Sequence, residues 1–212
     1  VEGMPLINLR RVPLDNLWNS FVKRAFDIVC SLLGLIVLSP LFLAVAIGVK
    51  LSSPGPVIYS QERMGKDKKI FVMYKFRSMA VEGNADTTTW GTRRDPRRTR
   101  FGAFLRKFSI DELPQLWNVL RGDMSLVGPR PERPYFVERF RDEIPLYMIK
   151  HLVRPGITGW AQVNGWRGDT SIEKRIEFDL HYIENWSFLF DLKILFLTLF
   201  HGIVNPSEDV GS

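Results

Sequence analysis

Cysteine is almost missing from this sequence. Its one thiol, Cys30, lies within an apolar run and cannot form an intrachain disulfide, which indicates a reducing or membrane-embedded setting. Histidine is scarce too. His151, His181 and His201 are scattered along the chain and form no recognisable metal-binding set, so a metal site built on histidine is not expected.

The signatures of common nucleotide-binding folds are also missing. The sequence has no GxxxxGK(S/T) loop and no GxGxxG loop, and no helix-turn-helix, zinc-finger or RNA-recognition pattern is visible. Nucleic acid is therefore not expected as a partner. The charge balance is nevertheless basic, with 29 Lys and Arg against 23 Asp and Glu, and this favours an anionic partner such as phospholipid head groups or a phosphorylated substrate.

The length of 212 residues suits one ordinary domain or a compact domain with a membrane anchor. A hydrophobic content of 45% is enough for a core, so global disorder is not expected. Because the sequence begins with Val1 rather than Met, we expect it to be a piece of a longer protein.

Residues 28–49 contain no charged side chain and are numerous enough for a transmembrane helix. A cleaved signal peptide fits poorly, because the run is too long and Lys50 follows it without a small-residue cleavage site. Ser39 and Pro40 lie near the middle of the run. Proline predicts a kink at this point, and the serine hydroxyl can satisfy a carbonyl that the kink frees.

Basic residues flank both ends of this run and argue against a simple span. A spanning helix would place one basic group on the wrong side under the positive-inside rule. A helix that breaks at Ser39-Pro40 and returns keeps both groups in the cytoplasm. The re-entrant hairpin is favoured, and a kinked spanning helix is the alternative. The basic groups are Arg10, Arg11, Lys23 and Arg24 before the run, and Lys50, Arg63, Lys66, Lys68 and Lys69 after it.

Two further segments have the character of interfacial helices. Residues 14–26 carry apolar side chains at helical spacing. Residues 188–204 are apolar but interrupted by Asp191, Lys193 and His201. For each segment a buried core helix is the alternative.

Between these segments the chain is polar and irregular. Residues 52–56 form a turn-rich linker. Short strands are predicted at 57–59 and 70–74, and the 65–69 loop between them predicts a β-hairpin. Residues 82–95 are rich in Thr, Gly, Asn and Asp without periodicity, which predicts a mobile loop that can close over a substrate.

An acidic pair, Asp111-Glu112, lies inside a strongly basic stretch, residues 93–131. One interpretation is structural. Ser109 is placed to cap a helix that begins at Ile110, and carboxylates are favoured in a first helical turn. The other interpretation is functional, because the surrounding cations would keep both carboxylates ionised and gather a diphosphate substrate. These cations are Arg97, Arg98, Arg100, Arg106 and Lys107.

In the functional interpretation the two carboxylates divide the work. One can attack phosphorus, as aspartates do in phosphoaspartyl enzymes. The other can hold Mg²⁺, a hard ion that prefers few carboxylates together with phosphate oxygens. The turn Gly128-Pro129-Arg130-Pro131 would present a guanidinium suited to bidentate phosphate contact.

These residues resemble the bacterial sugar transferases, the monotopic phosphoglycosyl transferases. The string FLRKFSIDELPQLWNVLRGDMSLVGPRP (104–131) resembles the catalytic core of that family. KRAFDIVCSLLGLIVLSP (23–40) resembles its membrane entry. PGPVIYSQERMGKDKKIFVMYKFRSM (54–79) and RPGITGWAQVNGWRGDT (154–170) are further similar blocks. The resemblance extends over residues 23–200, and Ile110 departs from it by standing where Leu is usual.

The resemblance implies a role for each candidate site residue. Asp111 would be the nucleophile that forms a sugar-phosphoryl-aspartate, and Glu112 would be its Mg²⁺-associated partner. One pair of basic residues is implied to contact phosphates, and a second pair is a weaker candidate for phosphate or nucleotide contacts. Ser39 and Pro40 would form the break that returns the helix. The basic pairs are Arg106 with Arg130, and Lys75 with Arg77.

The resemblance also implies the substrates. The C-terminal part is similar to members that start exopolysaccharide synthesis from UDP-glucose and undecaprenyl phosphate, with galactose or an N-acetylated sugar as alternatives. Trp166, Arg167 and Asp169 are candidates for sugar choice, although loop packing explains them equally well. Such members lie in the bacterial inner membrane with the catalytic domain on the cytoplasmic face, and many carry further membrane helices and a further domain before the catalytic part.

We therefore expect an α+β fold with a re-entrant membrane helix, interfacial amphipathic helices and a small β-hairpin on a mainly helical catalytic core. The expected divisions are a lead-in (1–22), the re-entrant helix (23–51), a cytosolic catalytic domain (52–187), an interfacial helix (188–204) and a tail (205–212). Membrane lipids are expected partners, and homo-oligomer formation stays open. Two other functions stay open: a membrane scaffold whose basic face binds anionic lipid, and a Mg²⁺-dependent diphosphatase that uses water as acceptor.

Overall fold

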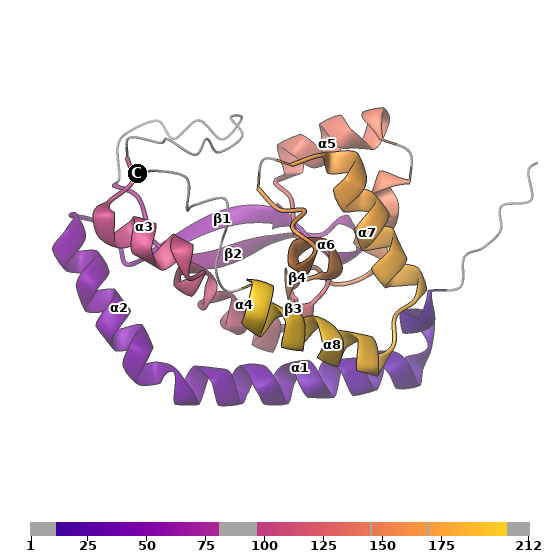
Figure 1. The fold of residues 1–212 in the computed structure, drawn as a ribbon, viewed down its shortest axis with the longest axis horizontal. Coiled ribbons are helices and arrows are strands. Elements are labelled where there is room, and N and C mark those ends of the chain that lie inside the picture. The colour runs from indigo at the N-terminus through magenta and orange to yellow at the C-terminus, as the bar shows by residue number, and fades with distance from the viewer. Residues whose placement is uncertain (1–11, 81–96, 145, 169, 203–212) are drawn as a thin grey trace, which may run out of the picture.

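A computed structural model of the chain describes residues 12–80, 97–144, 146–168 and 170–202. The fold is α+β, as predicted, with helices arranged around two small two-stranded sheets (Figure 1). The loop predicted at 82–95, the first part of the arginine-rich stretch and Asp169 lie outside the described residues.

The first two helices form one bent unit. The helix α1 (Leu17–Val37) begins after Asn16, whose side chain accepts hydrogen bonds from the first backbone N–H groups. The helix α2 (Ser39–Ser52) follows at an angle of 61°. At the bend the Ser39 hydroxyl donates to the Ile36 carbonyl oxygen at 2.8 Å. The kink at Ser39-Pro40 and the role of the serine hydroxyl are thus confirmed.

The bent pair lies along the outer edge of the molecule (Figure 1). Within the described residues, no single helix is long and apolar enough to cross a membrane, whereas α1 and α2 taken together meet that test by length and composition. Large apolar side chains cover the outward surface of the pair. The most exposed are Leu17, Trp18, Phe21, Val37, Leu43 and Leu51.

The predicted hairpin is confirmed, with longer strands than expected. The strands β1 (Ile58–Met64) and β2 (Ile70–Phe76) pair antiparallel, with Ile58 opposite Phe76 and Met64 opposite Ile70. The connection includes the 3-10 turn η2 (Lys66–Lys68). Lys75 is the last residue but one of β2, and its side chain extends to the acidic pair.

A second sheet joins two short parallel strands, β3 (Ser125–Val127) and β4 (Gly156–Thr158). The backbone that follows β3 stays in contact with β4. Gly128 N–H donates to the Thr158 carbonyl, and Gly156 N–H donates to the Pro129 carbonyl, both at 2.9 Å. A Cβ atom on Gly156 would overlap the Gly128 backbone. Glycine is required here for close approach, and the approach fixes the turn that carries Arg130.

The other helical elements surround these sheets. Core side chains from β3, α7 and α8 form the largest buried cluster, which includes Val127, Tyr182 and Ile194. The elements are η1 (Pro13–Asp15), α3 (Arg100–Lys107), η3 (Ile110–Glu112), α4 (Gln115–Arg121), α5 (Pro134–Glu143), η4 (Tyr147–Leu152), α6 (Trp160–Val163), α7 (Ile172–Glu184), α8 (Phe188–Leu197) and a π-helical turn (Thr198–Gly202).

A buried polar cluster joins α1 to the rest of the fold, and we call it the anchor cluster (Lys23, Tyr182, Trp186, Asp191). Asp191 Oδ2 accepts from Lys23 Nζ at 2.6 Å and from Trp186 Nε1 at 3.1 Å, and Oδ1 accepts from Tyr182 OH at 2.8 Å. Asp191, one of the charged residues that interrupt the apolar run 188–204, is therefore a buried structural contact, while Leu189 and Phe196 of the same helix are exposed.

Candidate active site

The acidic pair lies on a single 3-10 turn between α3 and α4. Ser109 adopts a left-handed backbone conformation with φ 54°, and its side chain makes no capping hydrogen bond. The expected side-chain cap by Ser109 is wrong, whereas the expected helical start at Ile110 is confirmed as a 3-10 turn. Leu113 and Pro114 keep right-handed helical φ/ψ values and join the 3-10 turn Ile110–Glu112 to α4, so the acidic pair does lie at the start of a helical segment. A side-chain cap by Ser109 therefore does not account for the two carboxylates, whereas their place in a first helical turn is retained.

Glu112 is held by two cations from separate parts of the fold. Its Oε1 atom accepts from Lys75 Nζ at 2.6 Å and from Arg130 Nη2 at 2.7 Å. Its Oε2 atom receives one longer hydrogen bond, from Arg130 Nη1 at 3.4 Å. Burial alone would raise the pKa of Glu112, but the charges of Arg130 and Lys75 outweigh it and hold that pKa well below its usual range.

Lys75 reaches the pair because β2 is docked on α4. Asn118 in α4 accepts a hydrogen bond from the Tyr74 backbone N–H at 3.1 Å and donates to the Val72 carbonyl at 2.7 Å. The Asn118 side chain is completely buried. Asn118 therefore fixes the position of β2, and with it Lys75, relative to the acidic pair. The sequence alone did not single out Asn118, and a buried amide with two backbone partners leaves no sequence motif.

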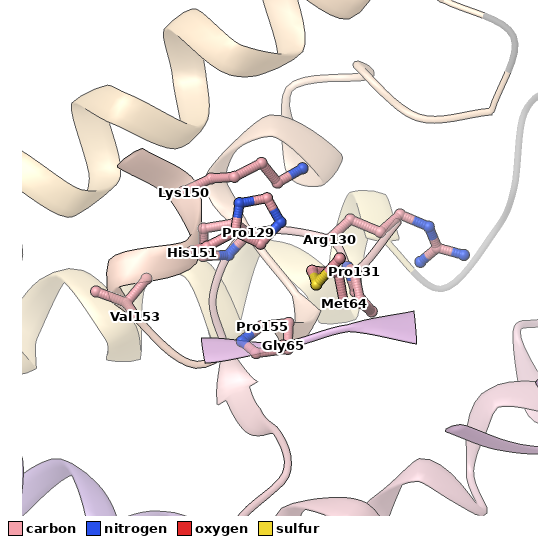
Figure 2. Close-up of a pocket in the computed structure, with 9 residues that line it drawn as sticks. All are labelled: Met64, Gly65, Pro129, Arg130, Pro131, Lys150, His151, Val153 and Pro155. Carbon is pink, nitrogen blue, oxygen red and sulfur yellow. The ribbon is translucent and has the colours of Figure 1, made fainter. Parts of the chain in front are cut away.

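Arg130 extends from the rigid turn after β3 toward Glu112. Figure 2 shows its side chain pointing away from Lys150 and His151, which lie on the other side of the turn with Pro129 and Pro155. The small cavity lined by these residues has a volume of about 10 Å³, which is enough for one water molecule. The cavity is therefore too small for a nucleotide, and the charged end of Arg130 serves the acidic pair.

Asp111 differs from Glu112 in its surroundings. Within the described residues its carboxylate accepts no hydrogen bond, although the side chain is only 7% exposed. Burial raises the pKa of Asp111 to about 6, against the opposing charges of Lys75, Arg106 and Arg130. Neighbouring carboxylates whose pKa values move in opposite directions are a mark of divided chemical roles.

The electrostatic field at the pair has a different source from the one that the sequence indicated. The cations in direct contact with Glu112 are Lys75 and Arg130, and neither belongs to the arginine-rich stretch before Asp111. Of that stretch, Arg106 in the last turn of α3 acts on the pKa of Asp111. The cations lower the pKa of Glu112 well below its usual range, whereas burial outweighs them at Asp111 and raises that pKa to about 6, so both carboxylates are ionised at neutral pH but by different margins.

Arg77 does not join the other candidates. Its guanidinium donates to the carbonyl oxygens of Ser53 and Pro54, each at 2.6 Å, and to that of Val49 at 3.4 Å. These carbonyls follow or end α2, where a cation is favoured. Lys75 and Arg77 are two residues apart, as on one face of a strand, and the Arg77 N–H still donates to the Val57 carbonyl at 2.9 Å, but the two side chains reach different partners.

The candidates for sugar choice lie beyond the Arg130 turn. Trp166 packs near Phe178 of α7, with ring centroids 6.1 Å apart. Gly165 and Gly168 on either side have φ values of 86° and 69°, which glycine adopts without strain. The segment is therefore tightly folded against α7.

The donor chemistry of the pair fits Mg²⁺. Asp111 has both carboxylate oxygens without a hydrogen bond from the described residues, and Glu112 Oε2 receives only the long one. A carboxylate has about four lone-pair positions, so acceptor capacity remains on both side chains. Mg²⁺ commonly takes one or two carboxylates together with substrate phosphates and waters. The described residues hold no group of three or more His, Cys, Asp or Glu side chains that could bind a metal by themselves.

Comparison with known proteins agrees with the geometry. The family model for bacterial sugar transferases matches residues 18–205. A curated relative from Escherichia coli (strain K12), named UDP-glucose:undecaprenyl-phosphate glucose-1-phosphate transferase, is 52% identical over 98% of this chain and 45% of its own length. One from Aeromonas hydrophila, named UDP-N-acetylgalactosamine-undecaprenyl-phosphate N-acetylgalactosaminephosphotransferase, is 48% identical over 85% of this chain and 43% of its own length.

A shorter relative matches over most of its length. The exopolysaccharide production protein PSS of Rhizobium leguminosarum bv. phaseoli is 46% identical over 84% of this chain and 93% of its own length. The chain spans less than half the length of the Escherichia coli and Aeromonas hydrophila proteins. With the family model covering most of the chain, this chain belongs to the bacterial sugar transferase family.

Proposed function

We propose that this protein transfers a sugar 1-phosphate from a UDP-sugar to undecaprenyl phosphate, with Asp111 as the nucleophile. The observation that carries the proposal is the contrast within the acidic pair. The charge of Glu112 is balanced by Lys75 and Arg130, while the buried Asp111 carboxylate accepts no hydrogen bond from the described residues and has a pKa raised to about 6. A carboxylate that is ionised at neutral pH but weakly solvated is a competent nucleophile.

The reaction has two balanced steps. In the first, an Asp111 oxygen bonds to the phosphorus that carries the sugar, and the bond from that phosphorus to the leaving UMP oxygen breaks. In the second, an oxygen of the polyprenyl phosphate bonds to the same phosphorus and the bond to Asp111 breaks, so the free carboxylate returns. Lys75, Arg106 and Arg130 would stabilise the charge that moves between the oxygens in both steps.

Mg²⁺ belongs to this proposal. When bound, the ion would neutralise charge on the donor diphosphate. Glu112 would hold it through Oε2, the oxygen that receives, from the part of the chain that the structure describes, one hydrogen bond at 3.4 Å. Lys75 and Arg130 keep that carboxylate ionised and oriented.

The site is proposed to lie at the cytoplasmic face of the bacterial inner membrane. The apolar outward surface of α1 and α2 supports this placement, and so do Leu189 and Phe196 of α8. A polyprenyl phosphate keeps its tail in lipid and its head at the surface, so a re-entrant pair would bring Asp111 to the acceptor. The 61° bend is compatible with re-entry or with a kinked span.

Glucose is the proposed sugar, because two features point to it. The chain is 52% identical to a relative named for UDP-glucose, and the C-terminal part has the character of exopolysaccharide-initiating members. The Aeromonas hydrophila relative is named for N-acetylgalactosamine, so galactose and N-acetylated sugars are the next donors to test.

The test is UMP release from UDP-glucose by detergent-solubilised protein with Mg²⁺, with and without undecaprenyl phosphate, beside Asp111→Asn. Acceptor-dependent turnover that vanishes in Asp111→Asn supports the transferase. Steady turnover without acceptor would indicate a diphosphatase. If folded protein releases no UMP from any UDP-sugar, and if it binds lipid in a way that depends on the arginines, the membrane scaffold is indicated.

A further inference from the structure

Behind the Arg130 turn lies a buried ion pair that the proposed chemistry does not use. Glu132 follows Arg130 by two residues and is only 6% exposed. Its Oε1 atom accepts from Arg175 Nη1 at 2.8 Å. Its backbone carbonyl accepts from the Met64 N–H at 2.9 Å, where the hairpin meets the turn. The chain just after Arg130 is therefore held on both its side chain and its backbone.

Arg175 extends this contact to a third segment. It lies near the start of α7 and is 2% exposed. Its Nη2 atom donates to the Gly168 carbonyl at 2.7 Å, while Nη1 binds Glu132. The fork of one guanidinium thus joins the Arg130 turn to the segment that carries Trp166 and Arg167. A lysine cannot reproduce two such contacts at once, because its ammonium is a point donor on a flexible chain.

Several cations surround the Glu132 carboxylate. Burial would raise the pKa of Glu132, but Lys150, Arg175, Arg63 and Arg130 together lower it. Arg63 also donates to the Pro131 carbonyl at 3.2 Å. Arg130 is one of these charges, so the Glu132 carboxylate interacts electrostatically with the guanidinium that also binds Glu112.

We propose that Glu132 and Arg175 form a positioning pair that sets Arg130 opposite the acidic pair and ties it to the segment 166–168. The pair touches neither carboxylate of the acidic pair and acts through Arg130. This inference rests on the proposed function, since the consequence of a displaced Arg130 is weaker binding of the donor diphosphate and slower transfer. A purely structural role predicts lower thermal stability without a dependence on Arg130.

The experiment is a double-mutant comparison on the solubilised, full-length chain. Arg175→Lys and Glu132→Gln are each made alone and together with Arg130→Lys. The affinity for UDP and kcat/KM for the UDP-sugar are measured for every variant, with the thermal midpoint measured separately. Lys174→Gln is the matched control, because Lys174 is the preceding residue on α7 and pairs with Glu177 at the exposed surface.

The expected result is a loss of up to about 100-fold in kcat/KM for Arg175→Lys and Glu132→Gln, as for misplacement of a catalytic contact by about 1 Å. In the Arg130→Lys background the same changes should cause almost no further loss, because coupled residues are not additive. Lys174→Gln should match the wild type in all three measurements.

Three results would overturn the inference. Equal losses with and without Arg130→Lys would mean that the pair acts independently of Arg130. Wild-type kinetics in folded variants would mean that it positions nothing. Loss of fold in both single variants would make it a folding element. If the wild type neither binds UDP nor releases UMP from any UDP-sugar, the proposed function is wrong and the positioning role falls with it.

Discussion

Two buried aspartates in this protein have opposite surroundings. Asp191 in the anchor cluster receives hydrogen bonds on both oxygens, from Lys23, Tyr182 and Trp186. Asp111 is nearly as buried and receives none from the described residues. Burying a charged group is costly unless it is paired and hydrogen-bonded. Asp191 holds α1 and α8 together, whereas Asp111 retains acceptor capacity on both oxygens, as the proposed nucleophile requires.

The largest expected effect is on activity at Asp111. Asp111→Asn should lower sugar-phosphate transfer by at least about 1,000-fold, because the nucleophile is removed. The same substitution should stabilise the fold at pH 7 by on the order of 1–3 kcal/mol, since the ionised carboxylate is disfavoured by burial and its pKa is raised to about 6. Turnover assays and thermal unfolding of one preparation check both parts. Unchanged turnover would remove Asp111 from the mechanism.

Asp191→Asn should have the reverse profile. It leaves the buried Lys23 ammonium without its partner at 2.6 Å, and we expect a loss of about 3 kcal/mol in the free energy of unfolding. The fraction that remains folded should keep a wild-type kcat/KM. The measurement is denaturant unfolding in detergent, with Arg139→Gln in an exposed pair as the control. Equal stability of Asp191→Asn and wild type would break the comparison between the two aspartates.

Removing one of the cations that bind Glu112 should lower activity less than removing the proposed nucleophile. Lys75→Gln and Arg130→Gln are each expected to lower kcat by about 100- to 1,000-fold, because each takes away one preorganised donor. Arg77→Gln is the matched comparison from the same region. It should lower stability while leaving kcat of the folded protein unchanged, because Arg77 binds the backbone at the end of α2. A loss of kcat in Arg77→Gln equal to that in Lys75→Gln would contradict this division.

The smallest expected effect is a shift in pH dependence. Asp111 must be ionised to attack, and its pKa is raised to about 6. Therefore kcat/KM should fall about tenfold per pH unit below about 6 and level off above it. Lys75→Gln should move this acid limb to higher pH, because the Lys75 charge lowers the pKa of Asp111. An acid limb near pH 4 in the wild type would mean that Asp111 is more solvated than its burial indicates.

Local features of the fold could be predicted from the sequence, and long-range contacts could not. The kink at Ser39-Pro40 and the hairpin follow from neighbouring residues, so pattern and turn chemistry were sufficient. The pairing of Lys23 with Asp191 joins residues 168 positions apart. Nothing in the run 188–204 distinguishes a buried ion pair from a polar interruption, because its partner is supplied only by the tertiary fold.

The same limit applies to the candidate site. Asp111, Glu112 and Arg130 stand in motifs that could be recognised, and the structure brings Glu112 and Arg130 together. Lys75 and Arg77 looked equivalent in sequence, and only their partners in the tertiary fold separate them: Glu112 for Lys75, and the backbone after α2 for Arg77. The raised pKa of Asp111 could not be foreseen, because its largest cause is burial, to which the charge of the adjacent Glu112 only adds.

The most direct test of the role of Asp111 is to incubate the protein with UDP-sugar and Mg²⁺ without acceptor, quench it, and locate any sugar phosphate by peptide mass spectrometry. We expect one equivalent of UMP in a burst and a sugar-phosphate adduct on Asp111, which disappears when undecaprenyl phosphate is added. No burst together with normal acceptor-dependent turnover, or an adduct on a different residue, would contradict a covalent role for Asp111.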